Sequence, residues 1–387
     1  MPLDFSSLQD QVDTFSENEK AFHHLLEEQI TQALQALKKF SLNIREMRTA
    51  GEKESKRIAL PFRENPNRVF SSHTTPSEYN LVCADGSQII PDPHDAPLFA
   101  LLNVGIVQMS SKDAVVTPTT ISQLYQHHEL YIDNELIGED ILNLDRDVLE
   151  MRLLSEHSCK LPGTTVALRD GLLELYHEPR SEKAYRERFS RYHGYLNDMQ
   201  RKDIITAGYV DKPRSQMLAA LLRVCSAQES QDQPTGSFFP DVIDRQLFEQ
   251  ILKAGERSAI FENHTIANGA RGDLEKMPSY FFYLNVSQNK KAWIVRVEIP
   301  QWVAADEKKV AVLHQVLLEQ CAIMGSRPYP YYLHRAHETA LVRQSEKEEL
   351  KKQIERTLIQ KEVPLEEGSY KQSAKDQPTH RKVERKR

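Results

Sequence analysis

Cysteine is scarce in this sequence, and the few cysteines are not arranged as ligands. The four thiols, at positions 83, 159, 225 and 321, lie far apart, and none belongs to a CxxC pair. The sequence therefore lacks the spacing that begins a zinc site or a dithiol redox motif. It also lacks HExxH, GxxxxGK(S/T) and GxGxxG, which excludes the common signatures of zinc proteases, P-loop nucleotide hydrolases and dinucleotide-binding folds.

Long apolar runs are missing as well. No stretch approaches the roughly 18 consecutive apolar residues that a membrane-spanning helix needs, and residues 1–15 lack the basic-then-apolar pattern of a secretory signal. We therefore expect a cytoplasmic protein. The composition, 40% hydrophobic and 27% charged, is that of a globular protein. Because the formal net charge is −6, any binding to nucleic acid must rely on locally concentrated Lys and Arg.

The two ends of the chain differ in composition from its middle. Residues 1–50 form an N-terminal helical segment, in which apolar side chains recur at three and four along residues 18–40. Such a stripe must be buried against its own domain or against a second subunit, and both alternatives remain open. Residues 51–78 are polar and contain prolines, which favours a connector. Residues 346–387 indicate a charged helix followed by a disordered basic tail.

Residues 79–345 carry the pattern of a folded domain. Apolar runs typical of strands occur at 81–84, 164–168 and 204–210, and helical periodicity occupies 134–158 and 181–203 between them. The runs at 280–286 and 292–299 are separated by a short polar segment, which predicts a hairpin. This mixture of hairpins and β-α-β alternation predicts an α/β domain with a mixed central sheet flanked by helices.

Two of the expected strands end in an Asp-Gly pair, at Asp85-Gly86 and Asp170-Gly171. A carboxylate at the end of a strand is held by rigid structure and still reaches solvent. Two such carboxylates on neighbouring strands could share Mg²⁺ or Mn²⁺, which prefer oxygen ligands and assist phosphodiester hydrolysis. Asp-Gly is also a common turn dipeptide, so the spacing alone leaves a plain turn as the alternative.

A basic loop joins the strand at 204–210 to the next expected helix. Lys212 and Arg214 flank Pro213, a residue suited to a helix start. Beside a helix N-terminus, both cations and the backbone N–H groups would face one phosphate. A solvated basic turn is the alternative.

Five segments, taken in order, resemble the NurA family of DNA-end nucleases over residues 79–345. They are 82–87 (VCADGS), 166–173 (VALRDGLL), 207–215 (AGYVDKPRS), 296–300 (RVEIP) and 329–337 (YPYYLHRAH). The resemblance implies an RNase H-like core, a homodimer, and cleavage of DNA that depends on Mn²⁺ or Mg²⁺. It also implies work in 5′–3′ DNA end resection and repair with a HerA-type hexameric ATPase that translocates DNA. A catalytically inactive adaptor that docks on the ATPase and contacts DNA is the alternative.

The resemblance also assigns residues to roles. Asp85 and Asp170 match the two metal-binding carboxylates, and a third family carboxylate on the preceding helix falls on Glu150, with Glu156 as the substitute. The family's C-terminal tyrosine and histidine fall on Tyr329 and His337, where His334 competes for the role. The residues expected to hold the DNA backbone are Lys202, Lys212 and Arg214.

Overall fold

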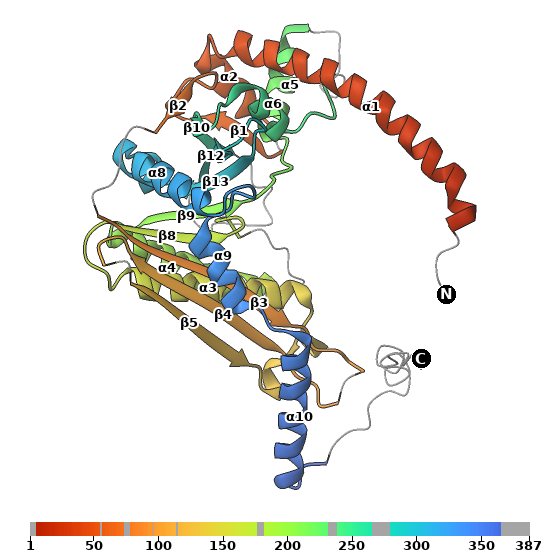
Figure 1. Cartoon of the computed structure of the whole chain (residues 1–387), viewed down its shortest axis with the longest axis vertical. Helices are drawn as coiled ribbons and strands as arrows, with labels where there is room; N and C mark the ends of the chain where they lie inside the picture. Colours follow the sequence, from red (N-terminus) through yellow and green to blue (C-terminus); the bar gives the residue numbers. More distant parts are fainter. Residues whose placement is uncertain are drawn as a thin grey trace, which may run out of the picture. The chain divides into compact units, whose positions relative to one another are not determined.

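The structure is a computed structural model that describes residues 5–54, 56–72, 78–94, 96–113, 115–175, 182–230, 238–264 and 279–364. Its elements fall into two compact units (Figure 1). Unit 1 comprises Met1–Ser77, Gly171–Leu173 and Thr206–Tyr331, and unit 2 comprises Glu78–Asp170, Glu174–Ile205 and Tyr332–Arg387. Most of the tail predicted to be disordered, from residue 365 onward, lies outside the described residues.

Unit 1 contains a sheet of antiparallel pairs with the order β1-β11-β12-β13-β9, to which β10 and β2 are added beside β12. The β12–β13 pairing confirms the hairpin predicted from the two apolar runs. Two of the strands lie in the segment expected to be a connector, where the apolar side chains of residues 58–60 are buried. The strands are β1 (Ile58–Pro61), β2 (Val69–Ser71), β9 (Ile205–Val210), β10 (Glu256–Ser258), β11 (Phe261–His264), β12 (Ser279–Asn285) and β13 (Ile294–Pro300).

Six helices of unit 1 are described: α1 (Phe5–Phe40), α2 (Ile44–Gly51), α5 (Met217–Ser230), α6 (Asp244–Ile251), α7 (Gln301–Ala304) and α8 (Glu307–Ile323). The second half of α1 packs on its own unit, where Leu26, Ala33 and Leu37 join the buried apolar side chains of α2, α5 and α6. The first half of α1 extends away from these helices (Figure 1). The apolar stripe in the second half of α1 is thus buried against its own unit, one of the two alternatives that the sequence left open.

Unit 2 contains a mixed sheet with the order β8-β3-β4-β5, in which β3 and β8 are parallel and the other pairs are antiparallel. Three antiparallel strands, a helix and a parallel strand follow one another along the chain, which is consistent with an RNase H-like core. The α/β fold with a mixed sheet flanked by helices is confirmed. The elements are β3 (Asn80–Ile89), β4 (Leu101–Ser110), β5 (Val116–Leu124), η1 (His127–Glu129), β6 (Tyr131–Ile132), β7 (Glu135–Leu136), α3 (Glu139–Ser158), β8 (Thr165–Asp170), α4 (Glu182–Arg201), α9 (Tyr331–Ala340) and α10 (Gln344–Gln360).

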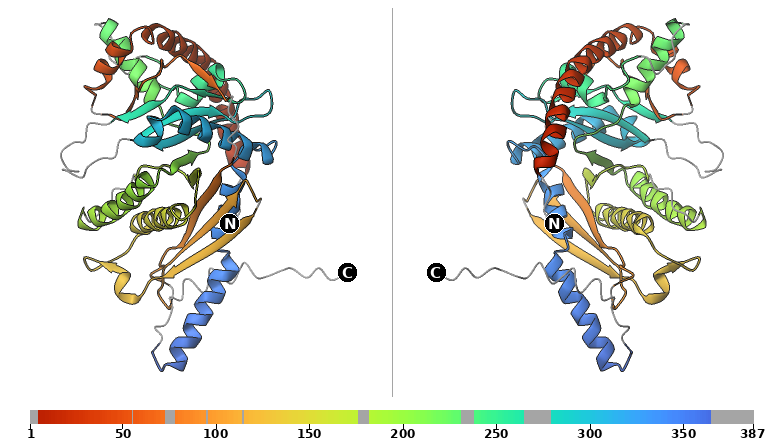
Figure 2. Two further views of the ribbon diagram at one scale, coloured as in Figure 1. Left: turned by 90° about the vertical axis from the view of Figure 1, so that its left-hand side faces the viewer. Right: turned by 90° about the vertical axis from the view of Figure 1, so that its right-hand side faces the viewer.

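Helices cover both faces of this sheet, with α3 and α4 on one side of the strands and α9 on the other (Figure 2). Successive side chains of a strand point to opposite faces. On β3, the side chain of Gln88 therefore meets α3, where it contacts Asn143 and Arg146. The neighbouring Ser87 meets α9, where its Oγ donates a hydrogen bond to Ala340 O. Residue parity along β3 thus decides which helix each side chain contacts.

No helix in the described ranges is long and apolar enough to span a bilayer.

Candidate active site

The first Asp-Gly pair lies inside a strand. β3 continues past Asp85-Gly86 to Ile89, so the prediction that the strand ends at Asp85 is wrong. Gly86 has another use, because a Cβ built there would lie 2.6 Å from Glu150 Oε1 and 2.8 Å from Arg146 Cγ. Glycine at this position lets two side chains of α3 lie against the strand backbone.

The second Asp-Gly pair ends its strand as predicted. β8 stops at Asp170, and Gly171 has a φ of +85°, a value that only glycine adopts easily. In the parallel β3–β8 pairing Ala84 is level with Arg169, so Asp85 and Asp170 follow at the next level. Neighbouring strands are about 4.8 Å apart. The two aspartates thus occupy neighbouring positions on adjacent strands, and the side chain of Asp85 lies on the face that α9 covers.

His337 on α9 completes a contact with the first of these carboxylates. Its Nδ1 is 2.6 Å from Asp85 Oδ2, and Asp85 Oδ1 accepts a hydrogen bond from the N–H of Gly86 at 2.8 Å. When Asp85 is ionised, Nδ1–H donates to it, which leaves the lone pair of the imidazole on Nε2. The competing His334 instead lies 3.7 Å from Glu338, one turn further along α9. Of the two histidines, His337 is the one in contact with Asp85.

Glu150 is buried on α3 between two arginines. Its Oε2 accepts a hydrogen bond from Arg169 Nη2 at 3.1 Å, and its Oε1 lies 3.3 Å from Arg146 Nε. Arg169 is only 4% exposed and also donates to Asp147 Oδ1 at 2.9 Å. Glu156, the substitute considered for the family carboxylate, is half-exposed and pairs with Arg152. Of the two glutamates, Glu150 is the one that lies against Gly86.

Sequence reasoning did not find the charged partners of Glu150. Glu150 follows Arg146 by four residues and Asp147 by three, so one face of α3 carries all three. The same helix buries Asp147 and Glu150 among its leucines. Charged residues at positions where the apolar periodicity expects core side chains were the available signal, because buried charges need partners.

Burial is the main electrostatic influence on Glu150. It raises the pKa of the Glu150 carboxyl to about 8, and the charges of Asp147 and Asp85 act in the same direction. Arg169 and Arg146 act against them and lower the pKa.

This raised pKa predicts a pH dependence of stability in the metal-free protein. Between the ordinary pKa of 4.5 and about 8, the folded state keeps a proton that the unfolded chain releases. The free energy of unfolding should therefore fall as pH rises through this window, by at most roughly 1.4 kcal/mol per pH unit. We expect Glu150→Gln to flatten the fall, measured by urea unfolding in a chelator. Glu156→Gln, at an exposed position, should keep the wild-type slope, and an equal slope in all three proteins would contradict the assignment.

Two other sequence motifs hold the turn that follows Asp170. In unit 1, the N–H of Gly171 donates to Tyr209 O at 2.8 Å, and the N–H of Leu173 donates to Glu298 Oε2 at 2.8 Å. Glu298 is buried and accepts a hydrogen bond from Arg296 Nη2 at 2.6 Å. Gly208 has no room for a side chain, because a Cβ there would lie 2.6 Å from Gly171 O. These contacts give the 207–215 and 296–300 segments a structural role next to the turn.

The remaining predicted residues are distributed over both units. In unit 1, the ring of Tyr329 packs edge-on against Tyr209 with 5.2 Å between centroids, and Lys212 Nζ lies 5.0 Å from the centroid of the Trp293 ring. Arg214 is exposed in unit 1, and Lys202 is exposed just after α4 in unit 2. The structure thus brings Asp85 and His337 into contact in unit 2, which also holds Glu150 and Asp170, whereas Tyr329, Lys212 and Arg214 belong to unit 1.

The expected anion site at the start of α5 needs a correction. The helix begins at Met217, and its first N–H groups, those of residues 217–219, donate to the carboxylate of Asp244 at 2.9 to 3.1 Å. Asp244 is fully buried and also accepts from Tyr283 Oη at 2.8 Å. These backbone donors are therefore already used within the protein. Any phosphate contact in this region is left to the side chains of Lys212 and Arg214.

The four side chains of unit 2 match a hard divalent cation in donor type, since carboxylate oxygens and imidazole nitrogen are ligands of Mg²⁺ and Mn²⁺. Two of the four donors, Asp85 and His337, are already in contact. Glu150 is engaged by arginines, and across the described ranges no three His, Cys, Asp or Glu side chains are placed to hold one metal ion together. The donor set thus fits a cation in chemistry, and in this arrangement Glu150 is paired with arginines instead.

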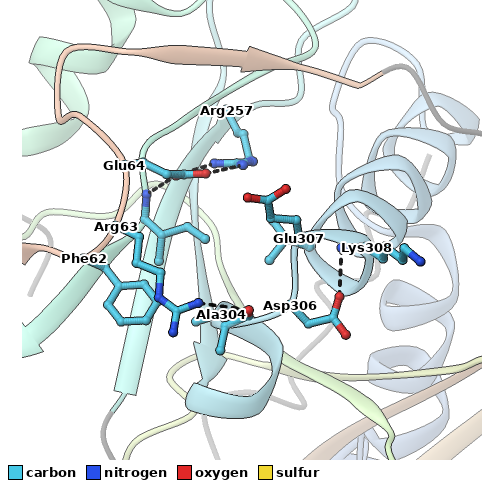
Figure 3. A pocket seen from close by; sticks show the side chains of 11 residues that line it. Phe62, Arg63, Glu64, Arg257, Ala304, Asp306, Glu307 and Lys308 are labelled. Carbon is cyan, nitrogen blue, oxygen red and sulfur yellow. Dashed lines mark hydrogen bonds and ion pairs between the residues drawn. The ribbon is translucent and has the colours of Figure 1, made fainter.

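A cavity of about 500 Å³ lies elsewhere, in unit 1 (Figure 3). Its charged side chains are largely engaged, because Arg257 makes two hydrogen bonds of 2.8 and 2.9 Å to Glu64, and Asp306 caps the start of α8. Arg63 donates to Ala305 O at 3.2 Å. None of the predicted catalytic or metal-binding residues lines this cavity.

The fold is an α/β fold with a mixed sheet flanked by helices, in which a carboxylate and a histidine are in contact. Residues 80–342 match the family model of the NurA domain, so the chain belongs to this family of nucleases. Among solved structures, a crystal structure of NurA with manganese is similar at a TM-score of 0.40 with 10% identity, covering 74% of this chain and 90% of that one. A crystal structure of NurA is similar at 0.37 with 10% identity, covering 88% and 97%. A comparison with curated proteins gives no match.

Proposed function

We propose that this protein is a metal-dependent deoxyribonuclease that hydrolyses phosphodiester bonds at DNA ends. The observation that carries the proposal is the 2.6 Å contact between Asp85 on β3 and His337 on α9, with Glu150 and Asp170 at adjoining positions. Membership of a nuclease family supports it. An inactive adaptor would not need the contact between Asp85 and His337.

The cation would be held by Asp85, Glu150, Asp170 and His337. When bound, Mn²⁺ or Mg²⁺ supplies a Lewis acid for the phosphate and lowers the pKa of water. Asp85 fixes the tautomer of His337, so that the imidazole presents Nε2 to a ligand or to a proton. Tyr329 would donate a hydrogen bond to a phosphate oxygen. Lys202, Lys212 and Arg214 would neutralise the DNA backbone.

The decisive experiment is a cleavage assay on end-labelled linear DNA with and without Mn²⁺. A nuclease should shorten the DNA only when the cation is present, and Mn²⁺ should raise its melting temperature, since a ligand that binds only the folded state stabilises it. Absence of both effects would favour the adaptor.

We also propose that the enzyme acts in 5′–3′ end resection with a HerA-type hexameric ATPase, as family membership suggests. DNA labelled at the 5′ end should then release label first, and addition of the ATPase with ATP should speed the release. Release that begins at the 3′ end would contradict the polarity. A rate that the ATPase leaves unchanged would contradict the partnership.

The exposed half of α1 supports the further proposal that the protein is a homodimer. Phe5, Leu8, Val12, Phe15 and Phe22 follow one another at intervals of three, four or seven, the repeat of a coiled-coil seam. Phe5 is 74% exposed and Phe15 is 63% exposed, so the described part of the chain does not bury these two side chains. It continues the stripe that α1 buries on its own unit from Leu26 onward.

We therefore expect Phe15→Glu to convert a dimer to monomers, because a charge in an apolar seam loses hydration without gaining a partner. Light scattering coupled to size-exclusion chromatography gives the mass. Ala21→Glu adds the same charge on the same helix outside the seam and should leave the dimer intact. A monomeric wild-type protein, or a dimeric Phe15→Glu variant, would contradict the prediction.

A further inference from the structure

Arg146 lies beside the carboxylate that we propose as a metal ligand. Its Nε is 3.3 Å from Glu150 Oε1, and its Nη1 donates to Gln88 Oε1 at 3.0 Å. Gln88 is held in turn, because its Nε2 donates to Asn143 Oδ1 at 2.7 Å. Within the described part of the chain, Arg146 Nε makes no hydrogen bond. Its contact with Glu150 is therefore a pairing of charges without good hydrogen-bond geometry.

The two arginines at Glu150 differ in how firmly they are fixed. Arg169 is buried and donates to Asp147, Glu150 and the hydroxyl of Tyr192. The side chain of Arg146 is 28% exposed, and its stem crosses Gly86, where no side chain holds it. Arg169 thus belongs to the buried core of the unit. Arg146 is held at Glu150 by longer contacts, because its Nε is 3.3 Å from Glu150 Oε1 and its Nη2 is 3.5 Å from Asp147 Oδ1. Rotation of this partly exposed side chain would take the guanidinium away from Glu150.

A divalent cation bound at Glu150 Oε1 would take the place of the Arg146 guanidinium, whose Nε lies 3.3 Å from this oxygen. Both would be within a few ångströms of Glu150 Oε1, where two positive charges repel each other. Binding of the cation at Glu150 therefore requires Arg146 to move away. The guanidinium that is released would stay close to Gly86, because the stem of Arg146 lies against this glycine.

We infer that Arg146 is the counter-charge of Glu150 in the metal-free protein and that a divalent cation displaces it, which frees the guanidinium to bind a DNA phosphate. The inference rests on the proposed function, since it needs a metal at Glu150 and DNA as substrate. A guanidinium offers two parallel N–H donors that match the oxygens of a phosphate. Cation binding and DNA binding then favour each other, and the coupling is reciprocal.

The test is Arg146→Met, which removes the charge and keeps much of the side-chain volume. Calorimetric titration of the full chain with Mn²⁺, without DNA and at about pH 9 where carboxylates are ionised, should give a Kd lower by roughly tenfold. Anisotropy of labelled duplex DNA in Ca²⁺ should show weaker binding. The slope of log affinity against log salt should be smaller by about one phosphate contact.

Two further variants make the result specific. Arg152 lies on the same helix, pairs with Glu156 at 3.8 Å and is 34% exposed. The variant Arg152→Met should therefore change neither the Kd for Mn²⁺ nor the DNA affinity. Arg146→Lys keeps the charge and loses the planar fork, so its Kd for Mn²⁺ should stay near the wild-type value while its DNA affinity falls. This variant also serves as the test if Arg146→Met fails to fold by circular dichroism.

The outcomes separate this inference from the proposed function. If wild-type protein binds Mn²⁺ and cleaves DNA, but Arg146→Met binds Mn²⁺ with the wild-type Kd, the displacement of Arg146 is wrong. A salt slope unchanged in both Arg146 variants overturns the phosphate contact. If the wild-type protein neither binds Mn²⁺ nor cleaves DNA, the proposed function fails and the inference fails with it.

Discussion

Asp85→Asn should slow DNA cleavage by roughly a thousandfold or more and leave the fold intact. The asparagine amide can still accept the hydrogen bond from the Gly86 N–H that Asp85 Oδ1 accepts at 2.8 Å. In Asp85, the oxygen Oδ2 lies 2.6 Å from His337 Nδ1. In the asparagine variant, the amide N–H₂ takes the place of this oxygen. The imidazole must then accept at Nδ1 and carry its proton on Nε2. The substitution thus removes a charged ligand and reverses the tautomer of His337.

The rate should be measured in single turnovers on end-labelled linear DNA with Mn²⁺, together with the melting temperature. Asp113→Asn is the matched control, since Asp113 is exposed after β4, and it should cleave at nearly the wild-type rate. Cleavage by Asp85→Asn within a few-fold of wild type would remove Asp85 from the chemical step. A thousandfold loss with an unchanged melting temperature would place its effect in catalysis.

Local pattern was enough to predict the two long helices of unit 2 and the β12–β13 hairpin. The periodicity over 134–158 corresponds to α3 (Glu139–Ser158), and the charged stretch at 181–203 corresponds to α4 (Glu182–Arg201). Both patterns arise from neighbours within a few turns, so they are visible in the sequence. The mixed sheet was predictable for the same reason, because hairpins and crossovers leave different patterns.

The two Asp-Gly pairs show where local pattern fails. Gly171 adopts a positive φ, which is a property of the turn itself, and the turn was predicted. Gly86 lies inside β3, and its requirement for glycine comes from Glu150 and Arg146 on a helix distant in sequence. The same dipeptide therefore has a local cause in one place and a long-range cause in the other. Sequence spacing alone could not distinguish them.

The contacts of the candidate site also join residues that are distant in sequence. Asp85 and His337 are 252 positions apart, and no periodicity links them, so only the family resemblance predicted that they belong together. Arg169 and its partner Glu150 lie 19 residues apart, on a strand and a helix, so no local pattern links them. The side chain of Arg169 points toward α3 and α4, where it pairs with Asp147 and Tyr192.

Gly105 determines how closely α9 can approach the sheet. It lies on β4 at the level of Asp85, below the helix that carries His337. A Cβ at this position would collide with Ala336 O and would lie 2.8 Å from Ala340 N. These are backbone atoms of α9, so the collision cannot be relieved by rotating a side chain. The helix as a whole must shift.

Gly105→Ala should therefore reduce both stability and activity. Forcing an extra methyl into a filled space costs about 1–3 kcal/mol, and a shift of α9 by about 1 Å would lower cleavage on the order of a hundredfold, because His337 loses its position against Asp85. Urea unfolding and the single-turnover assay give the two values. Gly194→Ala is the matched control, since a Cβ on this glycine of α4 meets no atom within 4 Å, and alanine should stabilise the helix by about 1 kcal/mol. If Gly105→Ala cleaves DNA as fast as Gly194→Ala, the close approach of α9 at this level is not what aligns His337 with Asp85.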